Sequence, residues 1–109
     1  MAIRTAQISS DGTVHGGDTD PDGSIHAKKN NPSEGNRPDI VRWVRDDPTK
    51  TYYITFKDND SPFDDVRFRV PETGNHTQRQ VKAAAELRHY EYDVSSETRT
   101  LADPDVIIE

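Results

Sequence analysis

The residues with the clearest chemical pattern lie at 18–25, in the run Asp18-Thr19-Asp20-Pro21-Asp22-Gly23-Ser24-Ile25. Carboxylates at every second residue can turn toward one cation, the glycine permits a sharp bend, and the Ser24 carbonyl would supply a further oxygen. This spacing matches the first eight positions of a calcium-binding loop. Asp18, Asp20, Asp22 and Ser24 are therefore candidate ligands for calcium.

The remainder of this loop fits calcium less well. The twelfth position of such a loop is normally a bidentate glutamate, and here it is Lys29, a cation where two oxygens are needed. Pro21 stiffens the segment, and no helical pattern flanks it. The alternative is a solvated acidic turn whose aspartates accept hydrogen bonds from their own backbone, with no cofactor bound. Both interpretations stay open at the level of sequence.

Other catalytic and metal-binding patterns are missing from the sequence. The chain has no cysteine, which excludes disulfides, thiolate catalysis and cysteine-based metal sites. No two of the four histidines have the i, i+4 spacing of helical metal ligands, and surface positions are expected for them. No glycine-rich phosphate loop, nucleophile elbow or His-Glu-x-x-His motif occurs. We therefore predict no catalytic residues and a protein that is not an enzyme.

Composition limits both the core and the partners. The chain has 109 residues, of which 30% are hydrophobic and 31% charged, as expected for one domain with a small core. The formal charge is −6, from 20 acidic and 14 basic residues. An acidic surface disfavours nucleic acids and anionic membranes, because both are bound through Lys and Arg. The absence of a signal-peptide pattern and of any run of about 20 apolar residues predicts a soluble, cytoplasmic protein.

The elements that would position these residues divide into two parts. Residues 1–38 are rich in Gly, Asp, Asn, Ser and Pro, and residues 39–109 contain the only Trp and every Tyr and Phe. We expect 1–38 to be a loop-rich part with one or two edge strands. Alternation at 3–9 and the Asp-Gly turn after it predict an edge strand with a hairpin return at 13–15.

The part from 39 to 109 is predicted to hold the core. Alternating apolar residues predict strands over 40–44, 52–56, 66–70, 90–94 and 106–108. Trp43 is expected in the core beside Tyr52, Ile54 or Phe56, because large aromatic residues are the main apolar area available. The strand at 106–108 is expected to be paired inside a sheet.

One short helix or helical turn is predicted near 77–87. Thr77 and Gln80 fit a capping box, and the run Ala83-Ala84-Ala85-Glu86-Leu87 has high helix propensity. Around it, short strands separated by turn signals predict a mainly β protein, with a sandwich or barrel architecture.

The order of these pieces resembles the cupredoxin-like fold, a Greek-key β-sandwich. The pieces that carry the resemblance are Val41-Arg42-Trp43, Tyr53-Ile54-Thr55-Phe56, Ser61-Pro62-Phe63, Phe68-Arg69-Val70-Pro71, Tyr90-Glu91-Tyr92-Asp93-Val94 and Asp103-Pro104-Asp105-Val106-Ile107-Ile108. The family's copper site uses two His, one Cys and usually a Met. Tyr53 stands where the resemblance places the first copper histidine, and the chain has no Cys. The resemblance therefore implies a copper-free member, because blue copper needs a thiolate ligand.

These observations lead to one expected function and two alternatives. We expect a non-enzymatic β-sandwich module that binds another protein through its sheet edges or through the loops at one end. The first alternative is a calcium- or metal-stabilised β-domain that uses the loop at 18–25. The second is a small enzyme on a β scaffold, which no residue pattern in the sequence supports.

Overall fold

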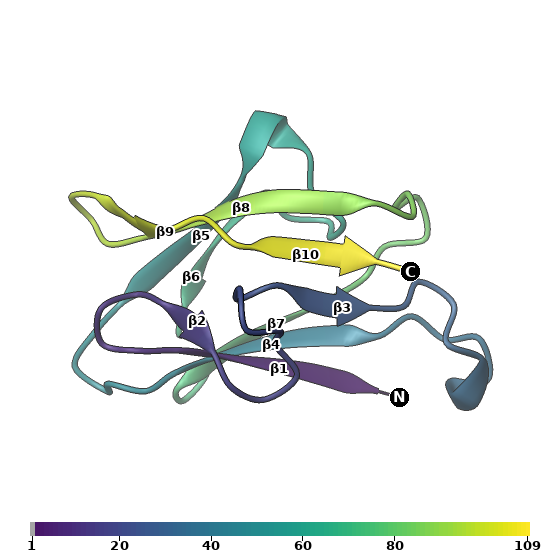
Figure 1. The fold of residues 1–109 in the computed structure, drawn as a ribbon, viewed down its shortest axis with the longest axis horizontal. Coiled ribbons are helices and arrows are strands. Elements are labelled where there is room, and N and C mark those ends of the chain that lie inside the picture. The colour runs from purple at the N-terminus through teal and green to yellow at the C-terminus, as the bar shows by residue number, and fades with distance from the viewer. Residues whose placement is uncertain (1) are drawn as a thin grey trace.

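The computed structural model describes residues 2–109 and shows two β-sheets packed on each other (Figure 1). The four-stranded sheet has the order β2-β1-β4-β7, and the six-stranded sheet has the order β3-β10-β8-β5-β6, with β9 paired to β8. The strands are β1 (Ile3–Ile8), β2 (Val14–His15), β3 (Ile25–Ala27), β4 (Ile40–Arg45), β5 (Tyr52–Phe56), β6 (Arg67–Val70), β7 (His76–Gln80), β8 (His89–Ser95), β9 (Thr100–Ala102) and β10 (Asp105–Ile108). The prediction of a mainly β protein is confirmed.

The N-terminal part contributes to both sheets. The hairpin predicted from the Asp-Gly turn forms, with β1 antiparallel to β2. Strand β1 is also parallel to β4 along its whole length, so it lies inside the sheet rather than at the expected edge. The second side of β1 is covered because β2 pairs with its end and the Asp18 amide donates to the Thr5 carbonyl at 2.7 Å. The edge strands of this part are β2 and β3.

The final strand is an interior one, as predicted. β10 lies between β3, to which it is parallel, and β8, to which it is antiparallel. Val106 and Ile108 point into the core and are buried. A continuous apolar run suits a strand that has neighbours on both sides.

Of the short helix or helical turn predicted near 77–87, the helix is wrong and only a single turn is present. His76–Gln80 is strand β7, which pairs antiparallel with β4, and the Thr77 hydroxyl donates to the Arg69 carbonyl instead of capping a helix. The alanine run makes only a turn, in which the Ala85 amide donates to the Lys82 carbonyl. Helix propensities of ordinary residues differ by less than about 1 kcal/mol per residue. A run of five residues is too short to offset the cost of helix nucleation. Residues 77–80 therefore pair with β4 instead of forming a helix.

The helical segments among residues 2–109 are two short 3₁₀ turns, η1 (Pro32–Glu34) and η2 (Lys57–Asn59). Neither has the length or apolar character that a bilayer-crossing helix requires. The connections between strands are therefore loops and turns, and several of them lie at the two ends of the packed sheets (Figure 1).

Aromatic side chains form the centre of the core. Trp43 is fully buried, as predicted, but its ring neighbours are Phe63, Phe68 and Tyr92 rather than Tyr52 or Phe56, with ring centroids 5.7, 5.3 and 5.8 Å away. The indole Nε1 donates a hydrogen bond of 3.1 Å to the Tyr92 hydroxyl, so the polar atom of the tryptophan is satisfied inside the core. Phe56 joins this cluster through Phe63 and Tyr92. The cluster connects the two sheets, because Trp43 lies on β4 while Phe56 and Tyr92 lie on β5 and β8.

Candidate functional site

The acidic loop predicted to bind calcium is a tight turn before β3. The Asp20 amide donates to the Ser24 carbonyl at 2.8 Å, so the carbonyl proposed as a ligand already accepts a backbone hydrogen bond. The Asp22 carboxylate accepts from the Ser24 amide at 3.0 Å, and this hydrogen bond lowers the pKa of Asp22. Asp18 is directed elsewhere, since its Oδ2 accepts from the Thr5 amide of β1 at 2.7 Å. The bonds of Asp20 and Asp22 within the loop are of the kind that the alternative interpretation, a self-capped acidic turn, requires.

The remaining carboxylate of the loop belongs to a histidine clamp. His26 Nε2 lies 2.8 Å from Asp20 Oδ2, and His26 Nδ1 pairs with the Glu109 carboxylate. The hydrogen bond with Glu109, opposed by partial burial and reinforced by Asp20, raises the pKa of His26. The two carboxylates lie on opposite sides of the imidazole. In residues 2–109 no group of three or more His, Asp or Glu side chains is placed to hold a metal ion, and the calcium site stays a prediction.

Two other histidines also pair with single carboxylates. His15 Nε2 lies 2.6 Å from Asp46 Oδ2, and His89 Nδ1 lies 3.2 Å from Asp105 Oδ2. These pairs and the His26 clamp share no residue, so the structure places His15, His26 and His89 in three separate contacts with carboxylates near the surface.

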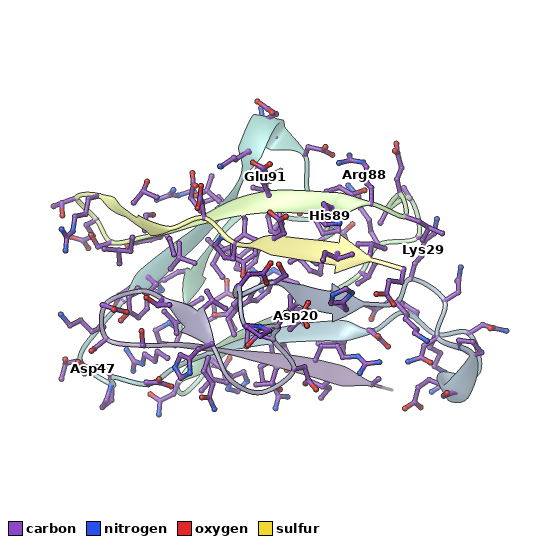
Figure 2. The ribbon with its side chains drawn as sticks, in the orientation of Figure 1. Asp20, Lys29, Asp47, Arg88, His89 and Glu91 are labelled. Carbon is purple, nitrogen blue, oxygen red and sulfur yellow. The ribbon has the colours of Figure 1, made fainter. Side chains whose placement is uncertain are left out.

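A groove lies at one end of the sandwich. Its volume is about 530 Å³. The lining residues, which we call the loop-end groove, are Lys29, Asn30, Pro38, Asp64, Gln80, Val81, Lys82 and Ala83. They come from three segments: the connection between β3 and β4, the connection between η2 and β6, and the end of β7 with the chain just after it. Figure 2 shows Lys29 at this end of the molecule, beside the end of β10.

A buried carboxylate fixes one wall of the loop-end groove. Asp39 is fully buried and accepts three hydrogen bonds, from the Lys28 amide (2.8 Å), Asn31 Nδ2 (2.8 Å) and Arg4 Nε (3.2 Å). Burial alone would raise the pKa of Asp39, but the three donors outweigh it and hold that pKa below its usual value. The Asp39 carbonyl also accepts from the Val81 amide at 3.0 Å. One residue therefore joins the β3–β4 connection, β1 and the end of β7.

The opposite wall is held by backbone hydrogen bonds. The Lys82 amide donates to the Pro62 carbonyl at 2.9 Å, which ties the turn after β7 to the loop before β6. The Lys29 ammonium reaches across and donates to the Ala85 carbonyl at 2.8 Å. Phe63, next to Pro62, is fully buried and anchors that loop in the core. The loop-end groove is thus built on loops whose backbone is fixed on both sides.

A smaller hollow of about 220 Å³ lies over the outer face of β8, where Figure 2 shows Arg88, His89 and Glu91. Its charges neutralise one another: Lys57 Nζ lies 3.3 Å from Glu91 Oε2, and Arg88 pairs with Asp60. The two basic residues of this hollow are therefore already paired with acids, and Asp58 adds a further negative charge to its lining.

The sequence predicted that binding residues would lie in loops at one end of the sandwich, but it marked none of the groove residues as a binding residue. Lys29 was noted only as a poor calcium ligand, and Gln80 and Ala83 only as parts of a predicted helix. No local signal marks Asn30 or Lys82. No protein-family model matches the chain, and a comparison with curated proteins finds no match. Function is therefore argued from the geometry of the chain itself.

Proposed function

We propose that this protein is a non-enzymatic binding module that recognises another protein through the loop-end groove. The observation that carries this proposal is the groove itself, about 530 Å³ in volume and walled by loops that Asp39 and the Lys82–Pro62 bond fix in place. Ligand sites commonly have volumes of about 300–1,000 Å³, and loops on a rigid scaffold are the usual carriers of binding.

The scaffold we propose is a copper-free cupredoxin-like Greek key. The pieces that carry the resemblance fall on β4, β5, β6, β8 and β10, and the chain passes repeatedly from one sheet to the other, which supports this assignment. Tyr53, at the position of the first copper histidine, lies on the outer side of β5 with the Arg67 guanidinium 4.8 Å from its ring centre. A shared scaffold does not bring a shared chemistry, and a binding role is compatible with it.

The same proposal includes the cellular setting. A chain without cysteine has no need of an oxidising compartment, and we place the module in the cytoplasm. Its net charge of −6 supports a protein partner over nucleic acid or an anionic membrane.

The test compares the proteins captured by three forms of the chain. Ala83→Trp fills the loop-end groove at an exposed position, and Thr98→Trp places the same bulk in the loop between β8 and β9, at the opposite end (Figure 1). Denaturation midpoints establish that both variants fold. We expect mass spectrometry to identify a protein that the native chain and Thr98→Trp capture and that Ala83→Trp loses. Equal capture by all three forms, or capture of nothing, would contradict the proposal.

A further inference from the structure

Several polar side chains of the loop-end groove have no hydrogen-bond or ion-pair partner within the described residues. Within residues 2–109 the side chains of Asn30, Gln80 and Lys82 have no hydrogen-bond or ion-pair partner. Lys29 uses one donor on the Ala85 carbonyl, and an ammonium group has three. Four side chains that can donate hydrogen bonds therefore border one hollow.

Several other basic groups in this chain are already neutralised. Lys57 lies within 4 Å of three carboxylates, Arg79 pairs with Asp65 and Glu72, and Arg88 pairs with two further acids. Lys82 belongs to the larger set of Lys and Arg residues that have no carboxylate within 4 Å in residues 2–109. Its position in the lining of the loop-end groove, together with Lys29, is what makes its charge available to a ligand there.

The charge of the groove has the opposite sign to that of the whole chain. Its lining contains two lysines and one acid, Asp64, whereas the chain carries −6. Pro38, Val81 and Ala83 add apolar surface between the polar groups. A ligand that fits this lining is anionic, accepts hydrogen bonds and presents short apolar groups.

We propose that the loop-end groove binds an acidic peptide segment of its protein partner. The carboxylates of that segment pair with Lys82 and Lys29 and accept from the side-chain amides of Asn30 and Gln80, while its apolar side chains contact Pro38 and Ala83. This inference rests on the proposed function and names the class of segment recognised. A nucleic acid fits less well, because two lysines on a chain of net charge −6 neutralise too few phosphates.

The experiment is a titration of the ¹⁵N-labelled full chain, followed by NMR, with two synthetic peptides. The acidic probe is acetyl-Glu-Leu-Glu-Leu-Glu-Leu-amide, and the neutral probe replaces each Glu with Gln. We expect the acidic probe to shift the backbone amides of 29–30 and 80–83 and the side-chain amides of Asn30 and Gln80. The neutral probe should bind at least about threefold more weakly, because exposed charge-assisted contacts are modest, and added salt should reduce the difference.

A matched pair of lysine variants tests whether the acidic probe binds through the charge of Lys82. Lys82→Gln should weaken binding of the acidic probe by about threefold or more. Lys50→Gln makes the same change next to Asp47, which Figure 2 shows at the end away from Lys29, and should leave the Kd unchanged. Both lysines are in exposed or half-exposed turns, so neither change should prevent folding.

Three results would overturn the acidic-peptide inference. They are equal binding of the neutral probe, equal effects of the two lysine variants, and shifts that occur outside the groove or not at all. Stronger shifts of the same amides by a 12-base-pair DNA duplex would assign the groove to nucleic acid instead. The capture experiment with Ala83→Trp is independent of these peptides. If that experiment succeeds while the acidic probe fails, the module function stands and only the class of segment is wrong.

Discussion

Replacing Asp39 removes the side chain that holds the wall of the loop-end groove. In Asp39→Ala the Lys28 amide and Asn31 Nδ2 lose their acceptor, and the Arg4 guanidinium loses its partner. A buried donor left unpaired costs about 1–3 kcal/mol, and Arg4, whose side chain is 34% exposed, can turn to water. With one such cost for each of the two donors, we expect a loss of about 2–6 kcal/mol in the free energy of unfolding.

Asp39→Asn tests the charge separately from the shape. The asparagine keeps one oxygen but presents an NH₂ group to donors, so we expect most of the destabilisation to remain. Urea denaturation followed by Trp43 fluorescence measures both variants, with the exposed Asp64→Asn as the control on the opposite wall. If Asp39→Asn unfolds at the midpoint of the native chain, the carboxylate does not hold this wall.

The pH dependence of the same pair has a definite sign. The pKa of Asp39 is lower in the folded chain, so its contribution is present above the unfolded value of about 3.9 and is lost as the pH falls through the folded value. The stability difference between the native chain and Asp39→Asn should therefore be constant near pH 7 and shrink in strong acid. A difference that grows on acidification would contradict this assignment.

Three further predictions concern the core, the last strand and the histidine clamp. Trp43→Ala should cost about 3–5 kcal/mol in chemical denaturation, because a fully buried ring is removed, and a loss below about 1 kcal/mol would place this ring outside the core. Deleting residues 104–109 removes an interior strand and should abolish the cooperative unfolding transition, whereas an unchanged midpoint would show that β10 is dispensable. The pKa of His26 is raised, so its pairing with Asp20 and Glu109 stabilises the fold below the unfolded value of about 6.5 and fades as the pH rises through the folded value. The denaturation midpoint of the native chain should thus exceed that of His26→Gln more at pH 5.5 than at pH 9, and a gap independent of pH would refute the ionic role of the clamp.

Local patterns predicted the strands well where one face is buried. In β5 and β8, apolar and polar residues alternate through the whole strand, and burial follows the same alternation. The prediction of a helix near 77–87 was wrong because helix propensity depends only on residues that are close in the chain. Thr77 is buried by its pairing opposite Trp43, a partner that no local window includes.

The loop-end groove could not be predicted from sequence for a related reason. Asn30 and Gln80 come together only because β3 and β7 end, and β4 begins, on the same side of two packed sheets. Asp39 reads in the sequence as one of many acids, and its burial depends on donors from Lys28, Asn31 and Arg4. The sequence could predict that binding residues lie in loops at one end of the sandwich. Which residues line the groove could be known only from the folded structure.

The position of β10 also has a consequence for how the chain acquires its structure. The neighbour of β3 in the six-stranded sheet is β10, with Ile25 opposite Val106. β3 is synthesised early, but it cannot pair in this sheet until β10, near the end of the chain, has been synthesised. Until then, one side of β8 lacks its partner and Ile25 lacks a covering strand. We expect the sheet to form in one late cooperative event rather than strand by strand during synthesis, and refolding on the millisecond-to-second scale typical of proteins built from distant contacts.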